Sequence, residues 1–140
     1  MTGWHVLILD DDLVAATVTQ YGLDRLLGPA VKATIANNPS SAWLQDNYSD
    51  IDLVIVDPNP QRRATLIFIQ ELREHQPDIP IVALTAYDTP RLRREMQTLG
   101  IQHYLTKPID LVQLVEEVRM VLKFEQPIRR RAYDQVLHAS

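Results

Sequence analysis

Short apolar runs alternate with longer amphipathic stretches along most of the chain. The runs at residues 6–9, 53–56 and 79–84 are almost uninterrupted by polar residues, a pattern typical of parallel strands that are buried on both faces. Val31–Ala36 alternates weakly and predicts a more exposed strand, and residues 101–105 predict a short fifth one. Strands that alternate strictly with helical stretches indicate one parallel sheet with helices on both faces.

The stretches between these runs have apolar residues at helical spacing and recognisable ends. Helices are predicted at Leu13–Leu27, after Asn38-Pro39 with apolar positions at 42–44, at Arg63–His75, at residues 90–99, and from Asp110 to a stop before Pro127. Asn38 and Asp110 are suitable N-caps because their side chains accept backbone N–H groups. Gly28 is expected to end the first helix in the left-handed capping conformation, and Pro29 cannot extend that helix.

Composition places the chain among single-domain globular proteins. It has 140 residues, of which 46% are hydrophobic and 23% are charged, and this suits one domain with its own core. The sequence contains no cysteine. A disulfide framework, a zinc–thiolate site, an iron–sulfur cluster and a cysteine nucleophile are therefore excluded for this sequence.

Membranes and nucleic acids are not indicated as partners. The apolar runs of about 4–6 residues are too short to span a bilayer, and the first residues do not resemble a secretory signal. The net charge is −4, which does not favour nucleic acid, so we expect a cytoplasmic protein. Residues 126–140 contain the basic triplet Arg129-Arg130-Arg131 and are interpreted as a C-terminal tail, the start of a linker or an extra helix, with the triplet as a solvated face.

Polar residues follow four of the predicted strands. Asp10 and Asp11 follow the first strand, Asp57 follows the third, Thr85 the fourth and Lys107 the fifth. Because ligands of parallel α/β sheets bind at the carboxyl ends of the strands, these side chains are candidates for one site. Each also has a simpler interpretation, since an aspartate can cap a helix or a loop, a threonine suits a strand, and most lysines are solvated.

Taken together, these residue types suit phosphoryl transfer. Carboxylates held close together repel one another, so they must share protons or a cation, and an oxygen-only site with few protein ligands suits Mg²⁺. Helix capping explains the pair Asp10-Asp11 less well than a metal does. Asp57 could form an acyl phosphate if a metal and Lys107 neutralise the incoming phosphoryl oxygens, and the Thr85 hydroxyl could donate to one of those oxygens.

The ordered set of motifs resembles the receiver domain of a two-component response regulator. The resemblance is carried by the first apolar run with Asp10-Asp11, then Leu53-Val54-Ile55-Val56-Asp57, Leu84-Thr85-Ala86 and Tyr104-Leu105-Thr106-Lys107-Pro108. Order and spacing match that family from Trp4 to about Phe124, and residues 1–125 are interpreted as the receiver domain. The resemblance implies a flavodoxin-like, doubly wound α/β fold, with a five-stranded parallel sheet in the order 2-1-3-4-5 and helices on both faces.

The resemblance also implies a role for each acidic residue. Asp57 would be the phosphoacceptor, which takes a phosphoryl group from the phosphohistidine of a partner kinase. Asp10, Asp11 and Asp57 would hold Mg²⁺, with the backbone carbonyl of Asn59 as a further ligand. Phosphorylation and dephosphorylation of the aspartate would be self-catalysed, which differs from the activity of a turnover enzyme.

A conformational switch is implied as well. Thr85 and Lys107 would hold the phosphoryl oxygens, and Tyr104 would turn inward as Thr85 moves toward the phosphoryl group. The changed surface would lie at residues 90–123. A simpler interpretation of Tyr104 is a half-buried strand aromatic with its hydroxyl in water. Tyr87, which flanks the path of hydrolytic water in this family, would either shield the acyl phosphate or face solvent from its loop.

The loop after Asp57 departs from the family pattern. Receivers usually carry Met-Pro after two variable residues, whereas this chain has Pro58-Asn59-Pro60-Gln61, with Pro60 at the Met position. Two prolines restrict the backbone of Pro58 and Asn59, so the direction of the Asn59 carbonyl is in doubt. We therefore expect slower phosphorylation or weaker Mg²⁺ affinity than in a typical receiver.

The resemblance names classes of partner. It implies a sensor histidine kinase or a phosphotransfer protein, and it is compatible with a homodimer and with an effector domain or a downstream protein as the output. The Pro58/Pro60 loop favours an alternative in which the chain is a receiver-like interaction module that is never phosphorylated. A metal-dependent phosphohydrolase is a third interpretation, but the residue two positions after Asp57 is Asn59 and not a second acid.

Overall fold

Five parallel strands form one sheet in the computed structural model, which describes residues 3–36 and 50–123. The strands are β1 (Trp4–Leu9), β2 (Val31–Ala36), β3 (Leu53–Val56), β4 (Ile81–Thr85) and β5 (His103–Thr106). Their order in the sheet is β2-β1-β3-β4-β5, and each neighbouring pair is parallel. The predicted fold class and strand order are confirmed.

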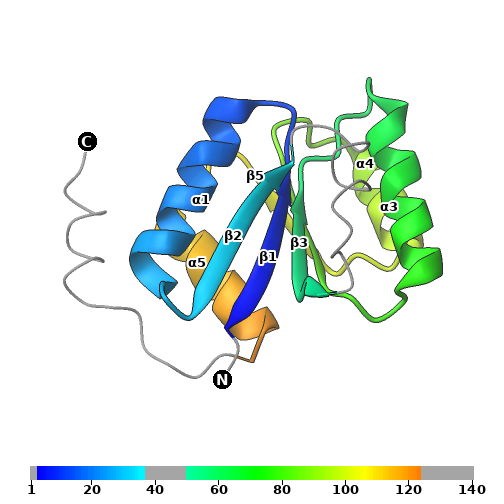
Figure 1. Ribbon diagram of the computed structural model, residues 1–140. Helices are drawn as coiled ribbons and strands as arrows, with labels where there is room; N and C mark the ends of the chain where they lie inside the picture. Colours follow the sequence, from blue (N-terminus) through cyan, green and yellow to red (C-terminus); the bar gives the residue numbers. More distant parts are fainter. Residues whose placement is uncertain (1–2, 37–49, 124–140) are drawn as a thin grey trace.

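Helices cover both faces of this sheet. They are α1 (Leu13–Leu27), α3 (Arg63–His75), α4 (Pro90–Thr98) and α5 (Leu111–Val121). Figure 1 shows α1 and α5 on one face, with α3 and α4 on the other. The side chains of Asp12, Thr89 and Asp110 accept backbone N–H groups at the starts of α1, α4 and α5, whereas α3 starts after Arg62 without a side-chain cap.

The continuous apolar runs are explained by two cores, one on each side of the sheet. Neighbouring strand residues point to opposite faces, so Val6 and Ile8 pack with the core under α1 and α5. Leu7 and Leu9 pack with the core under α3 and α4. The strands in the middle of the sheet have no polar face because both of their faces are covered.

Several predicted ends differ from the observed ones by one or two residues, and one predicted helix lies outside the described residues. Strand β1 begins at Trp4 and not at 6, β4 covers Ile81–Thr85 and not 79–84, β5 covers His103–Thr106 and not 101–105, and α4 ends at Thr98 and not at 99. Gly28 ends α1 with φ −66°, so the expected left-handed conformation is wrong. Glycine is needed there because a Cβ atom would lie 2.5 Å from the Asp24 carbonyl oxygen. Helix α5 ends at Val121, before Pro127 as expected, and the helix expected after Asn38 falls outside the described residues.

One arginine connects the loops at the edge of the sheet opposite the carboxyl ends of the strands. The guanidinium group of Arg73, near the end of α3, donates hydrogen bonds to the carbonyl oxygens of Pro77 and Ile79, which precede β4. It also donates to those of Leu99 and Gly100, which precede β5. The five donors of an arginine in a fixed planar arrangement make such a set of contacts feasible for one side chain.

Candidate functional site

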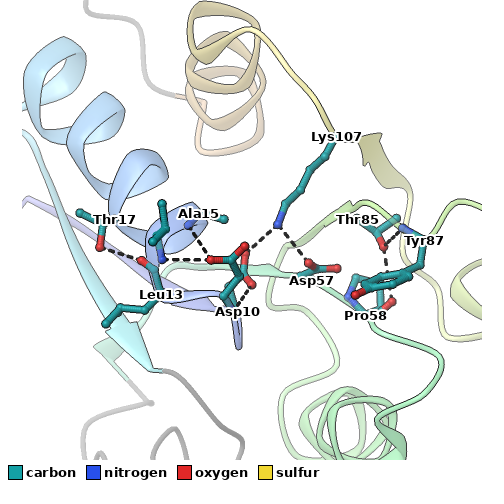
Figure 2. Close-up of polar contacts among 11 residues, drawn as sticks. Asp10, Leu13, Ala15, Thr17, Asp57, Pro58, Thr85, Tyr87 and Lys107 are labelled. Carbon is teal, nitrogen blue, oxygen red and sulfur yellow. Dashed lines mark hydrogen bonds and ion pairs between the residues drawn. The ribbon is translucent and has the colours of Figure 1, made fainter.

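The carboxyl ends of the strands bring the predicted polar residues together. Asp10 follows β1, Asp57 follows β3, Thr85 ends β4 and Lys107 follows β5. Figure 2 shows Lys107 extending from its loop to a position between Asp10 and Asp57, with Thr85 and Pro58 on the far side of Asp57. The topology therefore assembles one site from four segments that are distant in the sequence.

Lys107 joins the two buried carboxylates. Its Nζ donates to Asp10 Oδ2 at 2.9 Å and to Asp57 Oδ2 at 3.0 Å, and the side chains of these two aspartates are 7% and 5% exposed. The backbone of this loop is also fixed, because Lys107 N donates to the Thr85 carbonyl oxygen at 2.8 Å. The Lys107–Pro108 peptide bond is cis.

Burial and neighbouring charges act in opposite directions on the pKa values of Asp57 and Lys107. Burial raises the pKa of Asp57, and the neighbouring Asp10 charge adds to this, although the hydrogen bond and the charge of Lys107 act in the other direction. Burial opposes the charge of Lys107, but its hydrogen bonds to Asp10 and Asp57, together with their negative charges, outweigh burial and raise the pKa of the ammonium group. The site thus favours the charged form of Lys107, while burial works against the charge of Asp57 and Lys107 offsets part of that effect.

The acidic residues fit a divalent cation. Asp10, Asp11 and Asp57 each offer a carboxylate oxygen, and these atoms lie within 4.8 Å of one another. Asp57 Oδ1 is buried and has no hydrogen-bond partner among the described residues. A buried charged oxygen without a donor is costly, and an oxygen-only donor set suits Mg²⁺ in preference to softer metals.

The unusual proline loop forms a tight turn. The Asn59 carbonyl oxygen accepts a hydrogen bond from Arg62 N at 2.9 Å, so Pro60 occupies the second position of a four-residue turn, where its fixed φ is favourable. The Asn59 side chain supports the turn because its Oδ1 accepts from Gln61 N at 2.9 Å. A carbonyl has two lone pairs, so the carbonyl of Asn59 keeps an acceptor position, and its role as a metal ligand stays a prediction.

Arg62 is a member of the site that the sequence interpretation missed. Its Nε lies 2.9 Å from Asp11 Oδ2. Arg62 leads into the first turn of α3, and the sequence contains no periodic signal that connects it to Asp11. The common edge of the sheet was the available signal, because the loops after β1 and β3 both open there.

Thr85 is fully buried, and its hydroxyl group contacts the loop that follows Asp57. The hydroxyl donates to the Pro58 carbonyl oxygen at 3.5 Å, a long contact, and accepts from Tyr87 N at 3.0 Å. Both contacts are drawn in Figure 2. Tyr87 itself is 41% exposed.

Tyr104 belongs to a second polar cluster that was also missed. Its hydroxyl donates to Asp88 Oδ1 at 3.0 Å. Arg93 donates to the two carboxylate oxygens of Asp88 at 2.7 and 2.8 Å, and its guanidinium carbon lies 4.9 Å from the centre of the Tyr104 ring. These three residues, named here the surface clamp, connect the loop after β4, helix α4 and strand β5. Burial, followed by the contact with Asp88, raises the pKa of Tyr104 to about 12.

Comparison with known proteins identifies the family. Residues 6–119 match the model of the response regulator receiver domain, so the chain belongs to that family. Among curated relatives, the DNA-binding transcriptional regulator NtrC of Azospirillum brasilense is 31% identical over 127 residues, which cover 91% of this chain and 26% of that protein. NtrC of Rhizobium meliloti is 28% identical over 130 residues, covering 93% of this chain and 26% of that protein. The chain thus spans about a quarter of the length of these relatives.

Solved structures agree on the fold. A response regulator from Thermotoga maritima has a TM-score of 0.74 at 25% identity and covers 88% of this chain and 99% of its own. A CheY-like receiver domain protein from Methanospirillum hungatei has a TM-score of 0.76 at 18% identity, covering 87% of this chain and 95% of its own. Within the described residues, no helix is both long and apolar enough to cross a membrane.

Proposed function

We propose that this receiver domain is a phosphoaccepting switch in which Asp57 takes a phosphoryl group from a phosphohistidine. The observation that carries the proposal is the arrangement around Asp57: Lys107 donates to one oxygen of its carboxylate, and the other oxygen is buried without a partner in the part of the chain that the structure describes. A buried carboxylate that is only half satisfied is positioned to accept a further group. Family membership makes a sensor histidine kinase, or a phosphotransfer protein, the proposed donor.

The chemistry follows from the residues around the acceptor. An ionised carboxylate oxygen of Asp57 attacks the phosphorus atom, the P–N bond to the donor imidazole breaks with its electron pair on nitrogen, and the new P–O bond gives an acyl phosphate. Lys107 favours the ionised form of Asp57 and supplies a fixed positive charge next to the arriving phosphoryl oxygens. The Thr85 hydroxyl, now on the Pro58 carbonyl at 3.5 Å, is free to exchange this long contact for a phosphoryl oxygen.

Mg²⁺ is the proposed cofactor. Asp10, Asp11 and Asp57 would hold it, with the Asn59 carbonyl as a further ligand, and when bound it would neutralise charge on the phosphoryl oxygens. The chain's own contribution is to keep three carboxylates within reach of one cation. Loss of the acyl phosphate to water would return Asp57 to its resting form.

The output is a change at the surface formed by α4, β5 and α5. Movement of Thr85 toward a phosphoryl group would pull on the loop that carries Asp88, because Tyr87 N is bonded to the Thr85 hydroxyl. Asp88 holds the Tyr104 hydroxyl, so the same movement would loosen the surface clamp and allow Tyr104 to turn inward. The surface partner would be an effector domain, a downstream protein or a second copy of the chain, and the setting would be the cytoplasm, where the donor kinase domain acts.

Intact-mass measurement tests the proposal directly. The protein is incubated with acetyl phosphate and Mg²⁺, in parallel with Asp57→Asn and with a sample containing a chelator. We expect one phosphoryl adduct on the unmodified protein and none in the two controls. A folded protein that takes no adduct over a range of donor and Mg²⁺ concentrations would instead be an interaction module that is not phosphorylated, with the proline loop as the first suspect.

A further inference from the structure

One residue, Arg62, engages two of the four proposed metal ligands at once. Its side chain is paired with the Asp11 carboxylate through Nε at 2.9 Å, and its backbone N–H donates to the Asn59 carbonyl oxygen at 2.9 Å. Both contacts come from the residue that precedes α3. Because the backbone contact places Arg62 in the turn after Pro60, the side chain starts from a fixed point next to Asp11.

The three carboxylates of the site are divided between two protein cations. Lys107 binds Asp10 and Asp57, and Arg62 binds Asp11. The remaining Asp10 oxygen accepts from Asp12 N at 2.9 Å. Asp57 Oδ1 is left without a partner within residues 3–36 and 50–123. Without a metal, the repulsion between the carboxylates is therefore reduced by positive side chains from the β3–α3 and β5–α5 loops.

The two cations differ in how easily they can leave. The Lys107 side chain is 20% exposed and contacts two buried carboxylates. Its removal would leave these carboxylates buried without a counter-ion. The Arg62 side chain is 61% exposed and its partner Asp11 is 28% exposed. A long exposed side chain can return to water at little cost, because exposed ion pairs contribute little to stability.

We propose that Arg62 is a resident counter-ion of the metal site, which Mg²⁺ displaces from Asp11, and that Arg62 thereby sets the Mg²⁺ concentration at which the site fills. The inference rests on the proposed function, because it assumes that the acidic residues bind Mg²⁺. It assigns a cause to the weaker Mg²⁺ affinity expected from the proline loop: the Pro60 turn delivers a competing cation to Asp11, in addition to any effect on the Asn59 carbonyl.

The size of the effect follows from the exposure of the pair. A solvent-exposed arginine–carboxylate pair changes an equilibrium constant by about two- to fivefold. We therefore expect Arg62→Gln to lower the Kd for Mg²⁺ by about two- to fivefold. Glutamine keeps the backbone N–H that binds the Asn59 carbonyl, so only the side-chain competition is removed. Arg62→Lys keeps the charge and should leave the Kd close to that of the unmodified protein.

Calorimetric titration of the full chain with MgCl₂ measures these constants without phosphorylation. Arg63→Gln is the matched control, because it removes the same charge from the next residue, which lies on α3 and borders a separate groove with Leu66 and Arg91. Its Kd should stay near the unmodified value, whereas that of Arg62→Gln falls. Circular dichroism of each variant checks that the fold is retained.

A nuclear magnetic resonance titration gives a second readout that a purely structural role would not change. The Nε–H signal of Arg62, assigned by its absence in Arg62→Lys, should shift with the same Kd as the calorimetric signal, because the ion pair breaks as Mg²⁺ binds. An Nε–H signal that does not respond to Mg²⁺ would overturn the inference. Equal Kd values for Arg62→Gln and the unmodified protein would also overturn it. So would Kd values of Arg62→Lys and Arg63→Gln that are as low as the Kd of Arg62→Gln.

Failure of the proposed function would look different. If neither the unmodified protein nor Arg62→Gln binds Mg²⁺ at millimolar concentrations, the metal site itself is wrong and the inference falls with it. If all variants bind Mg²⁺ equally well and the protein still takes a phosphoryl group on Asp57, only the role of Arg62 is wrong.

Discussion

The buried cluster of Asp10, Asp57 and Lys107 and the exposed surface clamp contain the same kind of contact in opposite surroundings. Lys107 lies 2.9 and 3.0 Å from its two carboxylates, and Arg93 lies 2.7 and 2.8 Å from the oxygens of Asp88. Distance alone would rank the exposed contacts as the stronger ones. Water around Asp88 and Arg93 reduces their attraction, whereas the buried charges depend on each other because little water reaches them.

The pKa values of the two acids make the same point. Burial raises the pKa of Asp57 even though Lys107 is in contact with it. The hydrogen bond from Arg93 lowers the pKa of Asp88. Two aspartates, each paired with a cation, are thus shifted in opposite directions because only one of them has lost its water. The strength of a charge contact therefore depends on its burial as well as on its distance.

The largest expected effect comes from removing the cation of the buried cluster, and the same change in the surface clamp is its control. Lys107→Met leaves Asp10 and Asp57 facing each other, and we expect a loss of about 2 kcal/mol in the free energy of unfolding, less than for a fully buried pair because water reaches part of the lysine. Arg93→Met should cause no measurable change. Urea unfolding of both variants at neutral pH measures the difference. Equal losses would show that burial does not separate the clusters.

An intermediate effect is expected from Asp57→Asn. Removing a buried charge with one unsatisfied oxygen should raise the free energy of unfolding by about 1 kcal/mol at neutral pH. The folded protein binds the Asp57 proton more tightly than the unfolded chain, because the folded pKa is raised. Stability therefore falls as the pH rises from the usual aspartate range through the raised pKa.

The matched variant for that experiment is Asp88→Asn, because the pKa of Asp88 is lowered in the fold. The contribution of Asp88 is present above the usual aspartate pKa and disappears as the pH falls through the lowered one, which is the opposite sign. Urea unfolding from pH ~7 to ~3 should show that Asp57→Asn exceeds the unmodified protein in free energy of unfolding most at the highest pH. An advantage that grows toward low pH would contradict the assignment.

The smallest expected effect concerns the Tyr104 phenol. Asp88→Ala removes the acceptor of its hydroxyl, so its pKa should fall from about 12 partway toward 10.0, and it should stay above 10.0 because burial is the first cause of the shift. Ultraviolet titration, with Tyr104→Phe subtracted to isolate the signal, measures this. An unchanged pKa would mean that the surface clamp does not hold the hydroxyl in solution.

The sequence was a good guide where a repeating pattern or a strand end defines the position. The convergence of Asp10, Asp57, Thr85 and Lys107 follows from parallel strands that open at one edge of the sheet, whereas the order of the strands was implied by the resemblance to receiver domains. The roles proposed for these residues go beyond that placement and await the experiments above.

Contacts between loops could not be predicted in the same way. Arg62 with Asp11, and Asp88 with Arg93 and Tyr104, join side chains whose meeting depends on turn geometry and rotamers, which leave no periodic trace. Gly28 shows a related limit, because the end of the helix was predicted correctly but the backbone conformation of the glycine was not. Glycine is required there by the close approach of the Asp24 carbonyl oxygen, and not by a left-handed cap.

The arginine at the opposite edge of the sheet has a mechanical consequence for the switch. Arg73 holds the carbonyl oxygens of Leu99 and Gly100 at the end of α4, while the start of α4 is held by the surface clamp and the Thr89 cap. The end of α4 is therefore anchored by Arg73, whereas its start depends in part on the surface clamp, which the proposed switch would open. If movement of Thr85 opens the surface clamp as proposed, the first turn of α4 would move farther than the last turn, which Arg73 anchors.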